Sequence, residues 1–282
     1  METKLTCGEK QVIIGKGPTL IIGERINPTG KKKLAAALRE GDMEAVRLEA
    51  KNQVAAGAEI LDVNVVTEGV NEIDLLPVAM EAVLDTVKVP LCIDINNPKA
   101  LKKALEIYPG KALVNSVSGE KKSYEEVLPL VKEYGAAVIG LTLDDDGIPK
   151  TAEKRLEIAC KIVELAEAAG IPREDVVIDP LCLALGSDDQ AAFTTLKAVQ
   201  MIREKLGVNQ TLGASNVSFG LPNRIEVNKS FLPLAIRAGV TCPTVDPMKV
   251  GATIAATDLI LGRDRFSMRY ISDYRKRENI KM

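Results

Sequence analysis

The sequence predicts one α/β domain folded as a closed (β/α)8 barrel. Short apolar runs rich in Val, Ile, Leu and Thr alternate eight times with longer amphipathic stretches, a pattern that indicates repeated strand–helix units. The runs are apolar almost throughout, which is typical of parallel strands buried on both faces. The units are similar in size, and a chain of 282 residues is long enough for one such barrel, which commonly takes about 250.

The first predicted strand, TLIIGER, covers residues 19–25. The other predicted strands are residues 59–65, 90–96, 112–118, 136–143, 175–181, 211–217 and 241–247. Amphipathic stretches predict helices between them, among them residues 42–56, 124–133, 152–169, 193–205 and 249–261. An open doubly wound sheet is the alternative, but the first strand is not followed by the G-x-G-x-x-G turn of dinucleotide-binding sheets.

The barrel is expected to occupy residues 19–262. Residues 1–18 are predicted to form an N-terminal extension that resembles part of a hairpin. We expect this extension to fill the floor of the barrel. Residues 263–282 are charged and free of proline, so we expect a last helix or a partly ordered tail.

The charge balance argues against nucleic-acid and membrane partners. Lys and Arg number 37 against 39 Asp and Glu, which leaves a net charge of −2 and no broad basic surface. The N-terminus lacks an apolar signal region, and no window approaches the roughly 18 apolar residues of a membrane span. We therefore expect a cytoplasmic protein.

The chain contains no histidine. This excludes the usual imidazole base, Ser–His and Cys–His catalytic pairs, and histidine-ligated metal sites. The chemistry must use carboxylates, amides, lysines, arginines and backbone groups, and we expect no bound metal.

Polar residues gather where the predicted strands end, and in a (β/α)8 barrel this edge builds the active site. They are Glu24, Arg25, Asn27, Asp62, Asn64, Asp94, Asn96, Asn97, Asn115, Ser116, Asp179, Ser215, Asn216 and Asp246. Such a ring suits a flat heterocycle better than a phosphate. A phosphate site would need glycine-rich turns that open the late helices, and the sequence gives only a weak signal for such turns. A carboxylate can accept the adjacent 2-amino and N3–H donors of a pterin, and asparagine serves the remaining edges.

Six motifs in order along the chain resemble the pterin-binding methyltransferase family. They are IIGERINPTG, LDVNV, LCIDINN, LVNSVSG, VIDPL and GASNVSFG. The family includes the methyltetrahydrofolate–corrinoid/iron–sulfur protein methyltransferase and the folate module of cobalamin-dependent methionine synthase. The resemblance covers residues 19–262 and implies the same (β/α)8 barrel.

The resemblance also implies roles for single residues. Three are implied to hold the pterin, namely Asp94, Asn115 and Asp179. Asn216 is implied as the catalytic residue, near the folate N5 that bears the methyl group, where its amide would stabilise developing charge. The flanking pterin-binding candidates are Gly213, Ser215 and Arg224, and some relatives have glutamine where Phe219 stands.

The implied reaction moves the N5 methyl group of methyltetrahydrofolate to Co(I) of a corrinoid, reversibly. The corrinoid must sit on a separate protein, because the family's D-x-H-x-x-G carrier motif needs a histidine. Relatives are often homodimers. Two alternatives stay open: an enzyme like dihydropteroate synthase, although its S-R-K-type basic motif is lacking on the late strands, and a folate-binding subunit without turnover.

Overall fold

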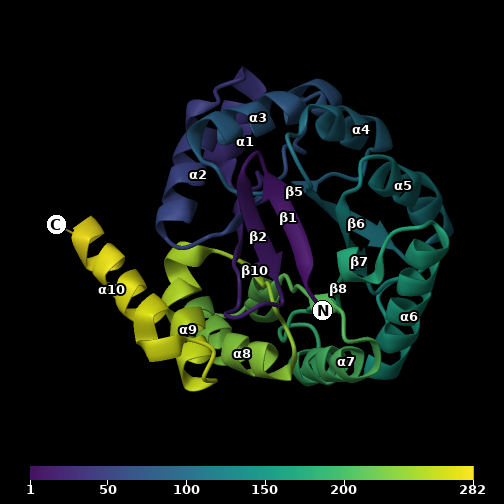
Figure 1. Ribbon diagram of the computed structural model, residues 1–282, viewed down its shortest axis with the longest axis vertical. Helices are drawn as coiled ribbons and strands as arrows, with labels where there is room; N and C mark the ends of the chain where they lie inside the picture. The colour runs from purple at the N-terminus through teal and green to yellow at the C-terminus, as the bar shows by residue number, and fades with distance from the viewer. Residues whose placement is uncertain (282) are drawn as a thin grey trace.

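Eight parallel strands curve into a barrel in the computed structural model, which describes the backbone of residues 1–281 and the side chains of residues 1–276 (Figure 1). The strands are β3 (Ile22–Ile26), β4 (Ile60–Val63), β5 (Leu91–Asp94), β6 (Leu113–Ser118), β7 (Ala137–Leu141), β8 (Val176–Asp179), β9 (Asn209–Gln210) and β10 (Thr244–Val245). From β3 to β9 each strand pairs with the next along the chain, and β10 pairs with β3. A parallel bridge between Gly213 and Thr244 closes the ring between β9 and β10. The predicted (β/α)8 barrel is confirmed.

Helices follow the strands and surround the barrel (Figure 1). They are α1 (Lys32–Glu40), α2 (Glu44–Ala55), α3 (Glu72–Thr86), α4 (Pro98–Ile107), α5 (Lys121–Glu133), α6 (Ala152–Ala168), α7 (Ala191–Leu206), α8 (Arg224–Ala238) and α9 (Pro247–Ile260). The helices predicted from periodicity lie within three residues of these bounds at either end, because their apolar stripes are those that pack against the sheet.

The prediction for the seventh strand was wrong in its position. Residues 211–217 were predicted as the strand, but β9 precedes them, and Ala214–Ser218 forms a 3-10 helix. The chain turns because the N–H of Asn216 donates to the carbonyl of Gly213 (3.1 Å), and that of Phe219 donates to the carbonyl of Asn216 (3.0 Å). Small polar residues favour such local turns over a strand. Asn216 therefore sits on a turn at the strand end.

Buried strand residues alternate between two apolar clusters. One lies inside the barrel and contains Ile22, Ile60, Cys92, Leu113 and Val177. The other lies between strands and helices and contains their neighbours, such as Leu61, Ile93, Val114 and Ile178. This is the two-residue period of a strand, and it fixes which side chains point into the barrel.

An N-terminal hairpin covers one end of the barrel. It consists of the antiparallel strands β1 (Thr3–Cys7) and β2 (Lys10–Ile14), which lie across the ring of helices in Figure 1. Leu5, Val12 and Ile14 join the apolar cluster inside the barrel. The hydroxyl of Tyr108 donates to the carbonyl of Thr6 (2.9 Å) at the start of the sheet. The hairpin fills the floor and leaves the carboxyl ends of the strands as the open end.

The last helix, α10 (Met268–Lys281), extends away from the barrel (Figure 1). Arg269 attaches its first turn to the body through Glu59 (2.9 Å), Asp258 (3.2 Å) and the carbonyl of Thr19 (2.8 Å). Burial raises the pKa of Glu59 to about 7, although the Arg269 charge lowers it. The helix is thus fixed at its base by buried ion pairs.

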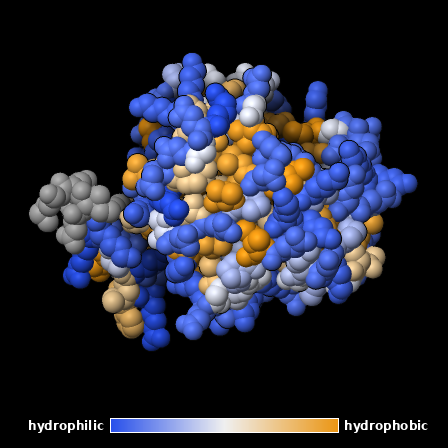
Figure 2. Space-filling model, turned by 90° about the horizontal axis from the view of Figure 1, so that it is seen from above, coloured by the Kyte–Doolittle hydropathy of each residue, from blue (hydrophilic) through white to orange (hydrophobic). Residues whose placement is uncertain are grey.

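The face of the molecule shown in Figure 2 carries mostly charged and polar residues, with apolar residues between them, chiefly near its middle. Scattered apolar residues of this kind are normal on a monomer surface. None of the helices in the described part of the chain has the length and apolar character needed to cross a membrane.

We expect Leu5→Ala to lower the free energy of unfolding by about 2–5 kcal/mol, because Leu5 is fully buried in the barrel floor. Urea unfolding followed by circular dichroism measures the change. Lys4→Ala, on the exposed face of the same strand, is the control and should change it by less than about 0.5 kcal/mol. Equal effects of both substitutions would show that the hairpin does not pack into the barrel.

Candidate functional site

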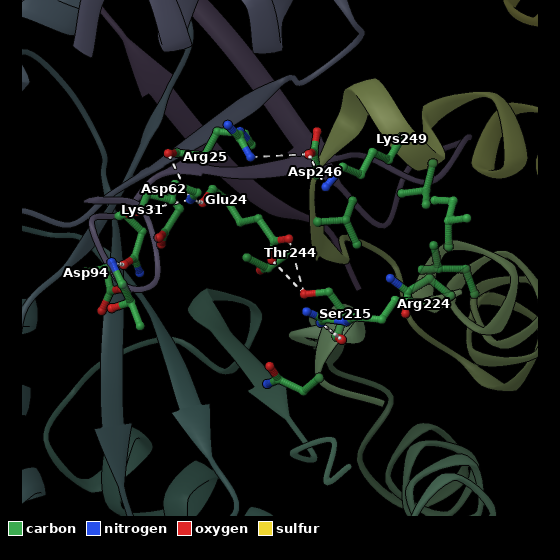
Figure 3. Close-up of a pocket in the computed structure, with 18 of the residues that line it drawn as sticks. Glu24, Arg25, Lys31, Asp62, Asp94, Ser215, Arg224, Thr244, Asp246 and Lys249 are labelled. Carbon is green, nitrogen blue, oxygen red and sulfur yellow. Dashed lines mark hydrogen bonds and ion pairs between the residues drawn. The ribbon is translucent and has the colours of Figure 1, made fainter. Parts of the chain in front are cut away.

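A cavity of about 600 Å³ opens at the carboxyl ends of the strands (Figure 3). Its wall includes these predicted site residues: Asp94, Asn115, Ser215, Asn216 and Arg224. It also includes polar residues without a predicted role: Glu24, Arg25, Asn27, Lys31, Asp62, Asn228, Asp246 and Lys249. Asp179 and Gly213 are not among the wall residues that the structure describes.

The strand period explains why the acids meet at the cavity. Each acid or amide follows, two positions later, a residue that is buried inside the barrel. The pairs are Ile22 with Glu24, Ile60 with Asp62, Cys92 with Asp94, Leu113 with Asn115 and Val177 with Asp179. Residues two apart point to the same face of a strand. These polar side chains therefore stack above the apolar barrel interior.

The side of the cavity formed by β4, β5 and β6 holds two carboxylates and two amides. In the sheet register, Asp62 lies opposite Cys92, and Asp94 lies opposite Asn115. The amide of Asn115 donates to Oδ1 of Asp62 (3.2 Å), and that of Asn64 donates to Oδ2 of Asp94 (2.9 Å). Asp94 is thus held by an amide that follows the adjacent strand β4, and Asp62 by an amide of β6, two strands away.

The two acids are in an environment that disfavours their charge. Burial raises the pKa of Asp62 well above its usual value, and the negative charge of Asp94 raises it further. Burial also raises the pKa of Asp94, while the hydrogen bond from Asn64 lowers it. Because two close carboxylates resist double ionisation, the pair favours a form in which one of them is protonated. It can then both donate and accept hydrogen bonds.

Asp179 and Gly213 contact each other beside the cavity wall. The N–H of Leu181 donates to Oδ1 of Asp179 (2.8 Å), and the backbone of Gly213 hydrogen-bonds the same carboxyl. Burial raises the pKa of Asp179 to about 6, although these hydrogen bonds lower it. A Cβ atom on Gly213 would lie 3.1 Å from Nδ2 of Asn216, so the glycine makes room for that amide.

Arg224 stabilises the loop that carries Ser215 and Asn216. Its Nε donates to Oγ of Ser218 (3.0 Å), and its Nη2 donates to the carbonyl of Ser215 (2.8 Å). The guanidinium lies 5.7 Å from the ring centroid of Phe219, a residue that is exposed and not on the described cavity wall. The arginine that borders the cavity thus also fixes its shape.

Glu24 is a wall residue for which no role was predicted beyond its place at a strand end. The hydroxyl of Ser215 lies 3.2 Å from both carboxyl oxygens of Glu24. Burial raises the pKa of Glu24 above its ordinary value, and the hydrogen bond from Ser215 lowers it. The two residues are 191 positions apart in the sequence, so only the closed barrel brings them together.

No site role was predicted for three further wall residues, Lys31, Asn228 and Lys249. They lie before or within helices, so the pattern of polar strand ends did not include them. Lys31 donates to the backbone carbonyls of Glu24 (3.3 Å), Arg25 (3.1 Å) and Asn27 (3.0 Å). It therefore anchors the turn after β3.

Metal binding receives no support from the side chains. Among the described residues, no group of three or more cysteines and carboxylates is placed to hold a metal ion.

The family profile described as "Pterin binding enzyme" matches residues 23–246. This chain belongs to the pterin-binding enzyme family. It is 35% identical over 266 residues to the methylcorrinoid:tetrahydrofolate methyltransferase of Eubacterium limosum, with 91% of this chain and 96% of that protein covered. It is 29% identical over 244 residues to the methionine synthase of Mycobacterium tuberculosis, of which it spans 20%.

Solved structures agree on the fold. The Yersinia pestis dihydropteroate synthase superposes with a TM-score of 0.71 at 14% identity, covering 92% of this chain and 99% of that one. The enzyme from Clostridium difficile superposes with a TM-score of 0.67 at 22% identity, covering 88% and 98%. At such identities the likeness concerns the barrel alone.

We expect Asp62→Asn to stabilise the protein at pH 8. A carboxyl whose pKa is raised by folding contributes stability only at low pH and loses it as the pH rises. The uncharged amide avoids this loss, so the gain in unfolding free energy should shrink as the pH falls toward 4. Urea unfolding between pH 5 and 8 tests this. Asp85→Asn, at an exposed position, is the control; a gain for Asp62→Asn that did not change with pH would contradict the assignment.

Proposed function

We propose that this chain is a methyltransferase that moves a methyl group between N5 of tetrahydrofolate and the cobalt of a corrinoid bound to a separate protein. The observation that carries the proposal is the cavity itself. In a pterin-binding family member, acid and amide groups from separate strands border one open pocket together with Asn216. The relative from Eubacterium limosum, similar over nearly the whole of both chains, supports the reaction.

The pterin is proposed to bind through Asp94, Asn115 and Asp179. A pterin edge presents a 2-amino group beside N3–H, which one carboxylate accepts as a pair. Asp94 and Asn115 lie on the cavity wall, and their amide and acid groups offer both donors and acceptors. Asp179 is half-buried and lies next to the loop of Gly213 and Asn216, where the backbone of Gly213 bonds its carboxyl group. Ser215 and Arg224 complete the loop side.

Asn216 is the proposed catalytic residue. N5 is a poor leaving group, so the carbon–nitrogen bond breaks only if charge on N5 is stabilised as it develops. An amide N–H held near N5 provides a hydrogen bond that is stronger in the transition state than in the ground state. The same hydrogen bond stabilises the transition state for methyl transfer in both directions. The name of the Eubacterium limosum relative gives the methylcorrinoid as donor, and the transition state is shared with the reverse transfer.

The corrinoid is proposed to arrive on a partner protein. The electron pair of the cobalt would attack the methyl carbon and displace N5, and the open end of the barrel is where a carrier can reach the folate. The chain has no histidine for a carrier motif. The methionine synthases are about five times longer than the segment this chain matches, so their other activities do not transfer. The family resemblance supports a homodimer, and the composition supports a cytoplasmic location.

Dihydropteroate synthesis is the second candidate, favoured by the structural likeness to enzymes of that name. The identity to those structures is at most 22%, against 35% to the methyltransferase. The late strands of this chain carry ASNVSFG rather than a basic motif for a diphosphate.

The deciding experiment mixes the protein with methyltetrahydrofolate and chemically reduced Co(I) cobalamin. Loss of the Co(I) absorbance and appearance of methyl-Co(III), at a rate proportional to the protein concentration, is the expected result. A parallel reaction holds 6-hydroxymethyl-pterin diphosphate and p-aminobenzoate. Product in the second reaction alone identifies a dihydropteroate synthase, and folate binding without product in either identifies a non-catalytic subunit.

We expect Asn216→Ala to lower turnover by about 10²–10³, the usual effect of losing one positioned hydrogen-bond donor. Single-turnover methyl transfer measures it. Phe219→Ala, which alters the same loop at an exposed side chain, is the control and should retain most of the activity. A loss of less than about threefold for Asn216→Ala would mean that another group stabilises N5.

Asp179→Asn should weaken folate binding by about 1.5–3 kcal/mol, because a charge-assisted hydrogen bond becomes a neutral one. Isothermal titration calorimetry with tetrahydrofolate gives the affinity directly. Asp189→Asn, on the exposed loop that follows, serves as the control. An unchanged affinity would place Asp179 outside the binding site.

A further inference from the structure

Glu24 holds a distinct position in the cavity. Its side chain leaves β3 and reaches across to the loop of Ser215 (Figure 3), whereas Asp62 and Asp94 are bonded to the amides of Asn115 and Asn64. Its backbone is held in place, since Lys31 donates to its carbonyl (3.3 Å) and Gln53 accepts the next N–H, that of Arg25 (2.8 Å). A carboxyl group is thereby fixed beside the residue that precedes Asn216.

The proposed reaction requires a proton that Asn216 cannot supply. When the bond between carbon and N5 breaks, N5 keeps the electron pair and must gain a proton to become the N–H of tetrahydrofolate. An amide does not release its own proton near pH 7, and no histidine exists in the chain. The proton must come from water or from an acid of the cavity.

Several other acidic and basic wall residues are bonded to groups away from the loop that carries Asn216. Asp246 caps α9 by accepting from Met248 N–H (3.1 Å), and it pairs with Arg25 (3.6 Å) and Lys249 (3.5 Å). Lys31 donates to three backbone carbonyls. Asp62 and Asp94 are bonded to the amides of Asn115 and Asn64, whereas Glu24 is bonded to the loop that carries Asn216.

We propose that Glu24 carries the proton of the methyl transfer and that the Ser215 hydroxyl orients its carboxyl group toward N5. The inference rests on the proposed function. In the direction of tetrahydrofolate formation, the cobalt electron pair forms the bond to the methyl carbon, Co(I) becomes Co(III), the carbon–N5 pair stays on nitrogen, and the Glu24 proton moves to N5. In reverse, N5 attacks the methyl carbon, the cobalt keeps its electron pair, and the Glu24 carboxylate takes the proton.

The surroundings of Glu24 suit a group that both gives and takes a proton. Burial raises its pKa, as does the negative charge of Asp246, while Ser215, Lys31 and Lys249 lower it. Arg25 and Asp62 also face it with opposite charges. A carboxyl whose pKa moves toward neutrality is an effective acid in one direction and an effective base in the other.

The test compares Glu24→Gln with Glu49→Gln, a matched change at a carboxylate that pairs with Arg25 (2.9 Å) outside the described cavity wall. Glutamine keeps the shape and one acceptor but cannot carry the proton. We expect Glu24→Gln to slow single-turnover transfer to Co(I) cobalamin by a factor of about 10²–10⁴. Its affinity for tetrahydrofolate should stay within about threefold of wild type. Glu49→Gln should transfer the methyl group at a rate near that of wild type.

A second readout does not depend on turnover. The ¹³C shift of the labelled N5 methyl group, bound to the wild-type protein without a corrinoid, should titrate with pH as the nearby Glu24 ionises. Glu24→Gln should lose this step. Ser215→Ala should keep the step but move it to higher pH, because the serine hydrogen bond lowers the pKa of Glu24.

The outcomes separate the two proposals. If the wild type does not methylate Co(I) cobalamin, the proposed function fails. If the wild type does so, but Glu24→Gln transfers within threefold of it or keeps the wild-type ¹³C titration, then Glu24 is not the proton carrier. If Glu24→Gln does not fold, an unshifted titration in Ser215→Ala overturns the assignment in its place.

Discussion

Closure of the parallel sheet is the constraint on which the rest of this structure depends. A closed ring of parallel strands brings all of their carboxyl ends to one rim, while the interior beneath must be filled with apolar side chains. Here the hairpin residues Leu5 and Ile14 complete that interior from below. Polar side chains can therefore collect above it, and the two-residue strand period determines that Glu24, Asp62 and Asp94 do so.

The buried acids of the protein fall into two kinds. Asp258 is fully buried and lies within 3.5 Å of Arg263 and 3.2 Å of Arg269, so its charge is compensated, and it attaches α10 to the barrel. Asp62 and Glu24 are bonded chiefly to amide or hydroxyl groups, and burial raises the pKa of each. Acids of the first kind stabilise the fold. Those of the second kind reduce its stability and are the ones a ligand can compensate.

The sequence predicted the parts of the fold that depend on local pattern. The strands of consecutive apolar residues were found, and the polar residues at their ends pointed to the correct rim. The seventh strand was predicted at the wrong position because only two residues pair there, too few to produce a recognisable sequence pattern. The contact of Glu24 with Ser215 and the positions of Asn228 and Lys249 depend on how helices and loops pack around the ring, which no local spacing encodes.

The barrel closes at the edge between the short strands β9 and β10, and this seam is less regular than the rest of the ring. On the opposite side of the ring, β6 and β7 run together over five or six residues, whereas the seam relies on one bridge and a few loop hydrogen bonds. The turn with Asn216 follows β9 at this weakly paired seam, while the carboxylates of Asp62 and Asp94 stand on β4 and β5, which are paired on both sides. A ligand that enters the cavity thus meets a continuously paired sheet on one side and, on the other, a seam where few hydrogen bonds must break for the loop to move.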